Sequence, residues 1–279
     1  MSKKSEYLPK LRAAQLEVFD YVTKFCDKAG IEYFLIGGTL IGALRHKGYI
    51  PWDDDIDIAM SRADYDRFFK EFPETDRFKL DDYNTNGGHF WLPFGKVRNV
   101  KTDFVQATTK DYPGSNGIWV DIFPFDNAED VNTPENNRAF YRKKLWGEFI
   151  MRKSNVNVEL PNTTSNKIKN ILAKIIPRRF AIKRQLAAMT KDKNDESKYI
   201  ISYNAKKDAN RETYLRSMVY PTKKVVFEGR KVRVPRDADA FLTQTFGDYM
   251  TIPPKSEQVT HMPLYVSFED GTKLDFRKK

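Results

Sequence analysis

Apolar residues near the start of the chain recur every three or four positions, which predicts a long amphipathic helix that ends at Gly30. The members of this stripe are Leu11, Gln15, Val18, Phe19, Val22, Phe25 and Cys26. An uninterrupted apolar run over 31–36 then predicts a buried strand. After it, Gly37 and Gly38 predict a tight turn, with Thr39 as the cap of a short helix.

Later segments continue with both strand and helix patterns. Residues 56–60 predict a second apolar strand, and Ser61 with Asp64 three positions on approximates a capping box that opens a helix. The other expected strands lie in 78–107, in 118–125 and in a hairpin over 224–234 that turns at Glu228 and Gly229. The other expected helices are 135–151, 166–190 with a break at Pro177, and 237–246.

This mixture of elements predicts an α+β fold, in which a mixed sheet core is flanked by helices and carries an added helical region. We expect the core and its functional site in residues 1–130. Residues 131–220 are expected to form a basic, helical insertion, and residues 221–279 a hairpin, helix and tail that pack on the core.

The chain has 279 residues and a net charge of +10, which favours a polyanionic partner: nucleic acid, a membrane surface or a phosphorylated substrate. Eight basic residues and no acidic one lie between positions 160 and 191. An apolar stripe accompanies them, formed by Ile168, Ile171, Leu172, Ile175 and Ile176. We expect this stripe to pack on the core with the lysines in water. Peripheral association with an anionic membrane is the alternative.

Several classes of protein are disfavoured by what the sequence lacks. A single cysteine, Cys26, excludes an intrachain disulfide framework and a cysteine-based zinc site. We see no zinc knuckle, RNP-like run or helix-turn-helix signature, so we expect no nucleic-acid partner. No secretory signal pattern and no apolar run of membrane-spanning length is seen, which predicts a cytoplasmic protein or one at the inner face of the membrane.

Four aspartates fall within five positions of the segment PWDDDIDI, residues 51–58. On a strand, Asp55 and Asp57 point to one face while Ile56 and Ile58 point into a core. Two like charges that close are unfavourable unless a cation offsets them. Mg²⁺, with Mn²⁺ as an alternative, takes such oxygen ligands together with substrate phosphates. A solvated loop without a ligand is the other interpretation.

The neighbouring segments favour the metal interpretation. Gly37 and Gly38 let the backbone approach a phosphate, and the helix N-terminus at Thr39 offers free N–H groups. A strand, Gly-Gly, a short helix and a second strand with Asp-x-Asp is the layout of a nucleotidyltransferase-type site. Asp121 lies alone in an apolar strand and needs a partner. It is a third metal ligand, the base for an incoming hydroxyl, or the structural partner of an arginine such as Arg98.

The segments GGTLIGALRHKGYIPWDDDIDI and WVDIFPFD resemble motifs of the LicD family, relatives of the fukutin-type phosphotransferases, and FEGRKVRVP and FGDYMTIPP resemble its C-terminal motifs. The resemblance covers most of the chain. It implies a nucleotidyltransferase fold and the transfer of phosphocholine from CDP-choline to a cell-surface glycan, either teichoic acid or lipopolysaccharide. It also implies that Asp55 and Asp57 are metal ligands and that Asp121 is the third carboxylate.

One position departs from the family pattern. Members often carry two adjacent histidines after the PP motif, whereas here His261 is followed by Met262. A role for a histidine at this point therefore depends on His261 alone.

Further side chains are candidates for binding the donor. Lys96 and Arg98 alternate on one strand, so both face the phosphates or both lie on a solvated strand face. Arg45 and Lys47 contact phosphate or neutralise the aspartates, and we expect structural pairing for at least one of them. A choline head group is expected to meet an aromatic face, and Trp52 is favoured because it adjoins the acidic loop. The other aromatic candidates are Trp91, Trp119 and Tyr265.

The leading hypothesis is thus a Mg²⁺-dependent phosphotransferase that uses CDP-choline and a glycan acceptor, in one version lipid-linked, and releases CMP. A second hypothesis keeps the fold but uses another CDP-alcohol, such as CDP-glycerol or CDP-ribitol, or transfers a nucleotidyl group. A basic nucleic-acid-binding protein, an inactive scaffold and a metal-dependent glycosyltransferase are the alternatives of a different class.

Overall fold

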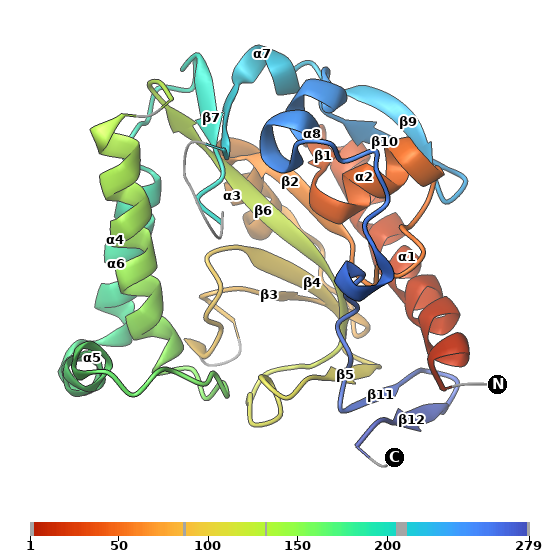
Figure 1. The fold of residues 1–279 in the computed structure, drawn as a ribbon, viewed down its shortest axis with the longest axis horizontal. Helices are drawn as coiled ribbons and strands as arrows, with labels where there is room; N and C mark the ends of the chain where they lie inside the picture. The colour runs from red at the N-terminus through yellow and green to blue at the C-terminus, as the bar shows by residue number, and fades with distance from the viewer. Residues whose placement is uncertain (1–2, 86–87, 132, 205–210, 278–279) are drawn as a thin grey trace.

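A mixed seven-stranded sheet forms the centre of the computed structural model, which describes residues 3–85, 88–131, 133–204 and 211–277 (Figure 1). Five strands follow the order β1-β2-β6-β4-β3, and β7 pairs with β6 and with β8. Strand β2 runs parallel to β6, and the other pairings in this sheet are antiparallel. Its strands are β1 (Tyr33–Leu35), β2 (Asp57–Ser61), β3 (Phe78–Asp81), β4 (Gly95–Asn99), β6 (Ile118–Ala128), β7 (Tyr199–Ile201) and β8 (Thr213–Leu215).

Two smaller sheets lie beside the main one. The hairpin of β9 (Lys223–Phe227) and β10 (Arg230–Val234) lies next to β1. Near both chain ends, β5 (Asp103–Val105) pairs with β11 (Tyr265–Ser267), which pairs with β12 (Lys273–Asp275) (Figure 1).

Helices lie against the sheet and at one side of it (Figure 1). The helices α1 and α3 pack on the sheet through an apolar core that includes Phe19, Phe68, Ile58 and Ile122. A second group, α4, α5 and α6, stands beside the β7 end of the sheet, where α4 and α6 contact each other along their lengths. The helices are α1 (Lys3–Ala29), α2 (Gly37–His46), α3 (Arg62–Glu71), α4 (Pro134–Met151), α5 (Thr164–Ile175), α6 (Arg178–Met189), α7 (Arg216–Val219), α8 (Ala238–Phe246) and the 3-10 helix η2 (Lys255–Glu257).

The architecture confirms the α+β expectation of a mixed sheet flanked by helices. Local signals in the sequence explain several element ends. The Ser61 hydroxyl accepts a hydrogen bond from the Asp64 N–H at 3.1 Å, which is the predicted cap of α3. Glu228 and Gly229 both have positive φ, at 48° and 74°, as a two-residue hairpin turn with matching twist requires.

Other features differ from the sequence-based expectation. Helix α1 begins at Lys3 and includes Pro9, so it extends beyond the apolar stripe from which it was predicted. The strands β7 and β8 lie inside residues 131–220, which were expected to be helical, and they lengthen the main sheet. Both have three residues, too few for a periodic pattern to show in the sequence. Within the described residues, no helix combines the length and the apolar run that crossing a membrane requires.

Candidate active site

Three charged side chains stand in one row across the middle of the sheet. Asp57 on β2 is paired directly with Asp121 on β6, and Asp121 is paired with Lys96 on β4. Paired residues point to the same face of a sheet, and the next residues, Ile58 and Ile122, point into the core on the other face. The strand alternation that buries the isoleucines therefore brings two carboxylates and one ammonium together.

Asp121 is the centre of this row. Its Oδ1 forms an ion pair with the Lys96 ammonium, and its Oδ2 accepts a hydrogen bond from Trp119 Nε1 at 2.8 Å. Asp121 and Lys96 are both 7% exposed. The Lys96 ammonium also lies 4.5 Å from the centroid of the Trp119 ring, a cation–π distance. The partner of Asp121 is thus Lys96, and not Arg98, which the sequence had offered as its structural partner.

The loop before β2 is held from two sides. The buried Asp54 accepts a hydrogen bond from the Tyr7 hydroxyl at 3.2 Å, and its Oδ1 lies 3.0 Å from Nδ1 of His261. Gln15 on α1 donates to the Asp54 carbonyl at 2.8 Å. Arg12, also on α1, donates to the Asp53 carbonyl at 2.8 Å. Helix α1 and the segment around residue 261 therefore fix the backbone that carries the aspartates.

His261 is brought to the acidic loop by these contacts. Its hydrogen bond with Asp54 raises the pKa of the imidazole against the opposing effect of burial, and Asp54 and Asp55 add to the rise through their charges. Nδ1 lies 3.9 Å from Asp55 Oδ2. The imidazole is thus stabilised in its charged form at the edge of the carboxylate group.

The carboxylates of this loop lie close together, and their negative charges repel one another. Burial first, and then the charges of Asp55 and Asp54, raise the pKa of Asp53 to about 8. Burial and the Asp121 charge raise the pKa of Asp55. Burial and the charges of Asp55, Asp121 and Asp53 raise the pKa of Asp57 well above its usual range, while Lys96 opposes the rise. Several like charges thus lie close together in a partly buried place with too little compensating charge.

The N-terminus of α2 lies against the same carboxylates. A Cβ at Gly37 would lie 3.2 Å from Asp57 Oδ2, and at Gly38 it would lie 2.6 Å from Asp53 Oδ2. Gly37 also has φ +57°, which disfavours any side chain there. Two glycines therefore let the positive end of the α2 dipole approach the acidic loop.

Thr39 has a different role from the predicted one. Helix α2 begins at Gly37, with Ile36 at the N-cap position and no side-chain cap. The Thr39 hydroxyl instead accepts a hydrogen bond from the Asp57 N–H at 2.9 Å. It thereby ties the start of β2 to α2, while the Asp57 carbonyl accepts from the Ile36 N–H at 3.2 Å on the β1 side.

The donor set can be tested against a metal ion. Across the described parts of the chain, no group of three or more His, Cys, Asp or Glu side chains is arranged to hold a metal ion. Mg²⁺, however, is usually bound by one or two carboxylates, with water and substrate phosphates completing its shell. Asp55 and Asp57 supply oxygen ligands of that kind, and the buried Asp53 Oδ2 has no hydrogen-bond partner among the described residues. Asp55 and Asp57 thus fit an open Mg²⁺ site, in which water, substrate or a further carboxylate completes the shell.

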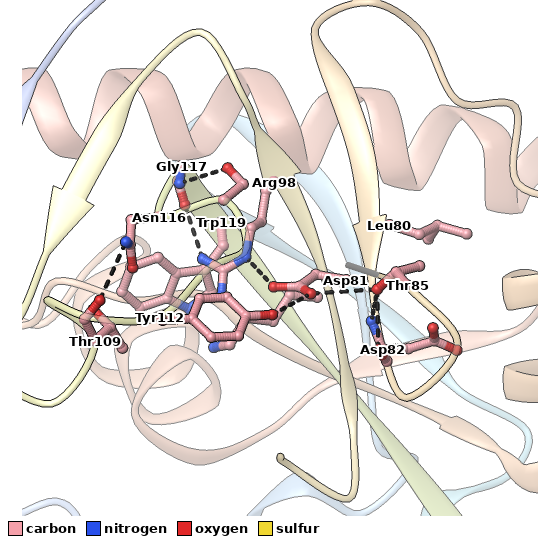
Figure 2. A network of polar contacts seen from close by, with 12 residues as sticks. Leu80, Asp81, Asp82, Thr85, Arg98, Thr109, Tyr112, Asn116, Gly117 and Trp119 are labelled. Carbon is pink, nitrogen blue, oxygen red and sulfur yellow. Dashed lines mark hydrogen bonds and ion pairs between the residues drawn. The ribbon is translucent and has the colours of Figure 1, made fainter. Parts of the chain in front are cut away.

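Arg98 does not lie with the acidic loop. Figure 2 shows its guanidinium directed at Asp81 on β3, with Tyr112 and Thr85 on the same carboxylate. The Arg98 Nε to Asp81 Oδ2 distance is 2.5 Å, and Nη1 donates to the Gly117 carbonyl at 3.0 Å. Lys96 and Arg98 share a face of β4, and both lie at cation–π distance from the Trp119 ring, at 4.5 Å and 5.6 Å, but Lys96 pairs with Asp121 whereas Arg98 pairs with Asp81.

Three other predicted binding residues have contacts outside the row of carboxylates. Arg45 donates to the Tyr249 carbonyl at 2.6 Å and so joins α2 to the segment after α8. Lys47 ends α2 in the left-handed region, and its carbonyl accepts from the Glu228 N–H at 2.9 Å. Trp52 is partly buried against the main core. Structural pairing thus accounts for the observed Arg45 contact, as expected for one of the two cations.

Several residues of the site had no role in the sequence-based prediction. Tyr7, Arg12 and Gln15 hold the acidic loop from α1, and Gln15 had been counted only as part of the apolar stripe. A polar glutamine inside an otherwise apolar stripe was the one sequence signal that this side of the helix binds a polar group. Trp119 was already an aromatic candidate for the choline head group, but its hydrogen bond to Asp121 was not foreseen, although strand alternation places both side chains on one face.

Comparisons with known proteins fit this geometry. A family model described as LicD/FKTN/FKRP, nucleotidyltransferase domain, matches residues 30–162, which include Asp55, Asp57, Lys96 and Asp121. The lipopolysaccharide cholinephosphotransferase LicD of Haemophilus influenzae is 31% identical over 264 residues, which is 88% of this chain and 92% of that protein. The human ribitol 5-phosphate transferase FKRP is 30% identical over 139 residues, which is 45% of this chain and 26% of that protein.

Proposed function

The chain belongs to the LicD/FKTN/FKRP family, and from that membership we propose a metal-dependent phosphotransferase that moves phosphocholine from CDP-choline to a hydroxyl of a cell-surface glycan and releases CMP. The observation that carries the proposal is the group of carboxylates around Asp55 and Asp57, both partly buried, which stand beside the N-terminus of α2 and raise one another's pKa. Such a group favours a bound cation and, through it, a phosphorylated substrate.

The reaction is a displacement at one phosphorus atom. The acceptor oxygen would bond to the phosphorus that bears choline, and the bond from that phosphorus to the bridging oxygen would break, leaving CMP. Asp121 is the proposed acceptor of the hydroxyl proton, since it lies in the row with Asp57. The Lys96 ammonium, in contact with Asp121, would lie against the phosphate oxygens and hold the carboxylate in place.

Asp55 and Asp57 are the residues proposed to hold Mg²⁺, with Mn²⁺ as the alternative and Asp121 as the further carboxylate beside them. When bound, the metal would neutralise charge on the diphosphate of the donor. His261 and the N–H groups at Gly38 and Thr39 would add positive potential on the side of the leaving group.

The quaternary ammonium of choline needs an aromatic surface. Trp119 contacts both Asp121 and Lys96, whereas the contacts of Trp52 are with the main core and the loop before residue 261. The Trp119 ring already lies at cation–π distance from the Lys96 ammonium, 4.5 Å, and the Arg98 guanidinium, 5.6 Å, so Trp52 is the proposed choline seat.

A second donor is supported by the match to FKRP, a ribitol 5-phosphate transferase. The choice of choline depends on the much longer match to the Haemophilus influenzae protein, which also makes lipopolysaccharide the first acceptor to test and teichoic acid the second. We propose the cytoplasm, up to the inner face of the membrane, as the place of the reaction, as expected from the sequence.

The test measures CMP release from CDP-choline, CDP-ribitol, CDP-glycerol and ordinary nucleoside triphosphates, with Mg²⁺ and with EDTA. We expect slow Mg²⁺-dependent hydrolysis of CDP-choline even without an acceptor, and its loss in Asp57→Asn. Asp76→Asn, at an aspartate 88% exposed, is the matched control and should keep full activity. Turnover of CDP-ribitol in place of CDP-choline would change the donor, and no CMP from any CDP-alcohol would refute the proposed function.

A further inference from the structure

Helix α5 turns its apolar face outward. Four aliphatic residues follow the spacing i, i+3, i+4 and i+7, so they occupy one side of the helix. All four are exposed: Ile168 by 53%, Ile171 by 60%, Leu172 by 40% and Ile175 by 72%. The expectation that this stripe packs on the core is therefore wrong for these residues, and of the predicted stripe only Ile176 packs in a core cluster.

The opposite side of α5 explains why it lies this way. Lys169 forms an ion pair with Glu148 of α4 at 2.7 Å, and Arg152 donates to the side-chain oxygens of Asn166 and Asn170 at 2.8 Å each. Ala173, on the same side, is 5% exposed. Polar groups thus join α5 to α4, and the protein gives the aliphatic side of the helix no partner among the described residues.

The surroundings of this face are basic. Lys167 and Lys174 are exposed one heptad apart at its border, and residues 160–191 contain no acidic side chain. An open hollow of about 550 Å³ on the α4 side of the helix adds further basic residues, since it is lined by Arg152, Lys153, Asn170, Ala173 and Lys174. An anionic membrane surface has two layers that suit such a face. The exposed aliphatic side chains match its acyl boundary, and the lysines beside them match its phosphate head groups.

We propose that the α5 face, meaning Ile168, Ile171, Leu172 and Ile175 with Lys167 and Lys174, docks the protein on a bilayer that contains anionic phospholipid. The aliphatic groups insert at the head-group boundary, and the lysines contact lipid phosphates. A second copy of the chain fits less well, because two such faces would bring their lysines together. Nucleic acid fits less well, because phosphate backbones offer no partner to four aliphatic side chains. The proposal is independent of the proposed function.

The test is flotation of the full-length protein with two kinds of vesicle, one of phosphatidylcholine alone and one of equal parts phosphatidylcholine and phosphatidylglycerol. We expect the protein to float with the anionic vesicles and to remain largely unbound with the neutral ones. The double variant Ile171→Ser with Ile175→Ser should bind anionic vesicles at least tenfold more weakly. The double variant Lys167→Gln with Lys174→Gln should bind on the order of thirtyfold more weakly, since each lysine near an anionic surface contributes about 1 kcal/mol, which is about fivefold in affinity, and two contribute the square of that factor.

Matched controls make the same changes elsewhere. Val226→Ser with Ile252→Ser replaces aliphatic residues that are 48% and 56% exposed, and Lys223→Gln with Lys224→Gln removes two exposed charges from β9. Both should bind like the unaltered protein, and all variants should keep its melting temperature. The proposal is overturned if the protein ignores anionic vesicles, if the α5 variants bind normally, or if light scattering shows a dimer that the Ile171 and Ile175 changes abolish without any vesicle binding.

Discussion

Replacing Arg98 with methionine distinguishes a guanidinium that supports the fold from one that binds the donor's phosphates. The Arg98 side chain is 5% exposed and that of Asp81 is 1% exposed, so the pair is buried. Removing one partner of such a pair leaves an uncompensated charge and costs about 3–5 kcal/mol. In a chain of this size each kcal/mol lowers the melting temperature by about 2 °C, so we expect a fall of roughly 6–10 °C.

The measurement combines stability with donor affinity. Thermal unfolding followed by circular dichroism gives the melting temperature, and CMP release well below it gives the KM for CDP-choline. We expect that KM to change less than about twofold, because the Arg98 guanidinium is held by Asp81 and the Gly117 carbonyl and meets the candidate site at the Trp119 ring, 5.6 Å away, and not at the carboxylates of the acidic loop. The control Arg277→Met breaks an exposed pair with Asp275 and should cost less than about 1 kcal/mol.

A second substitution tests the cause of the loss. Adding Asp81→Asn to Arg98→Met removes the uncompensated charge while the amide can still accept from Tyr112, so about 1–2 kcal/mol should return. The reasoning is refuted if Arg98→Met leaves the melting temperature unchanged and raises the donor KM tenfold, because Arg98 would then be a phosphate ligand.

Three further predictions concern the acidic loop and one distant carboxyl. Gly38→Ala places a Cβ 2.6 Å from Asp53 Oδ2, so kcat/KM for CMP release should fall at least about tenfold, and an unchanged value would contradict the close approach of α2. Tyr7→Phe removes the hydroxyl that donates to buried Asp54 and should cost about 1–3 kcal/mol in urea unfolding. Burial raises the pKa of Glu212 to about 7 from 4.5, so the folded state binds its proton more tightly and stability should fall as pH rises from 4.5 to 7. Glu212→Gln should remove up to about 3 kcal/mol of that fall, and parallel stability–pH curves for the two proteins would show that Glu212 is not the cause.

The sequence pattern predicted correctly those elements that depend on neighbouring residues, namely a strand, a helix start and a hairpin turn. The alternation over 55–58 predicted a strand with one buried face, and β2 begins at Asp57 with Ile58 buried, while Asp55 and Ile56 lie just before it; Ser61 marked the start of α3. The hairpin turn was predicted at Glu228-Gly229, and both residues have the positive φ that this kind of two-residue turn requires.

The pairing of distant segments was not accessible in this way. Register across strands decides that Lys96 meets Asp121 and that Arg98 meets Asp81, and the residue types alone allowed either cation to reach either carboxylate. The orientation of α5 was mispredicted for a related reason. An apolar stripe on a helix predicts burial only if the other face has no better partner, and here the ion pair of Lys169 with Glu148 holds the polar face inward.

The clamp on Asp54 has a consequence for how this domain is delimited. The matched family region spans residues 30–162, yet Tyr7, Gln15 and His261, which hold the aspartate, all lie outside it. A fragment cut to that region would keep Asp55, Asp57 and Asp121 but lose every one of these contacts to the loop. The structural unit that holds the candidate site is therefore larger than the region matched by the family model. It includes residues near both ends of the chain that hold Asp54 in place.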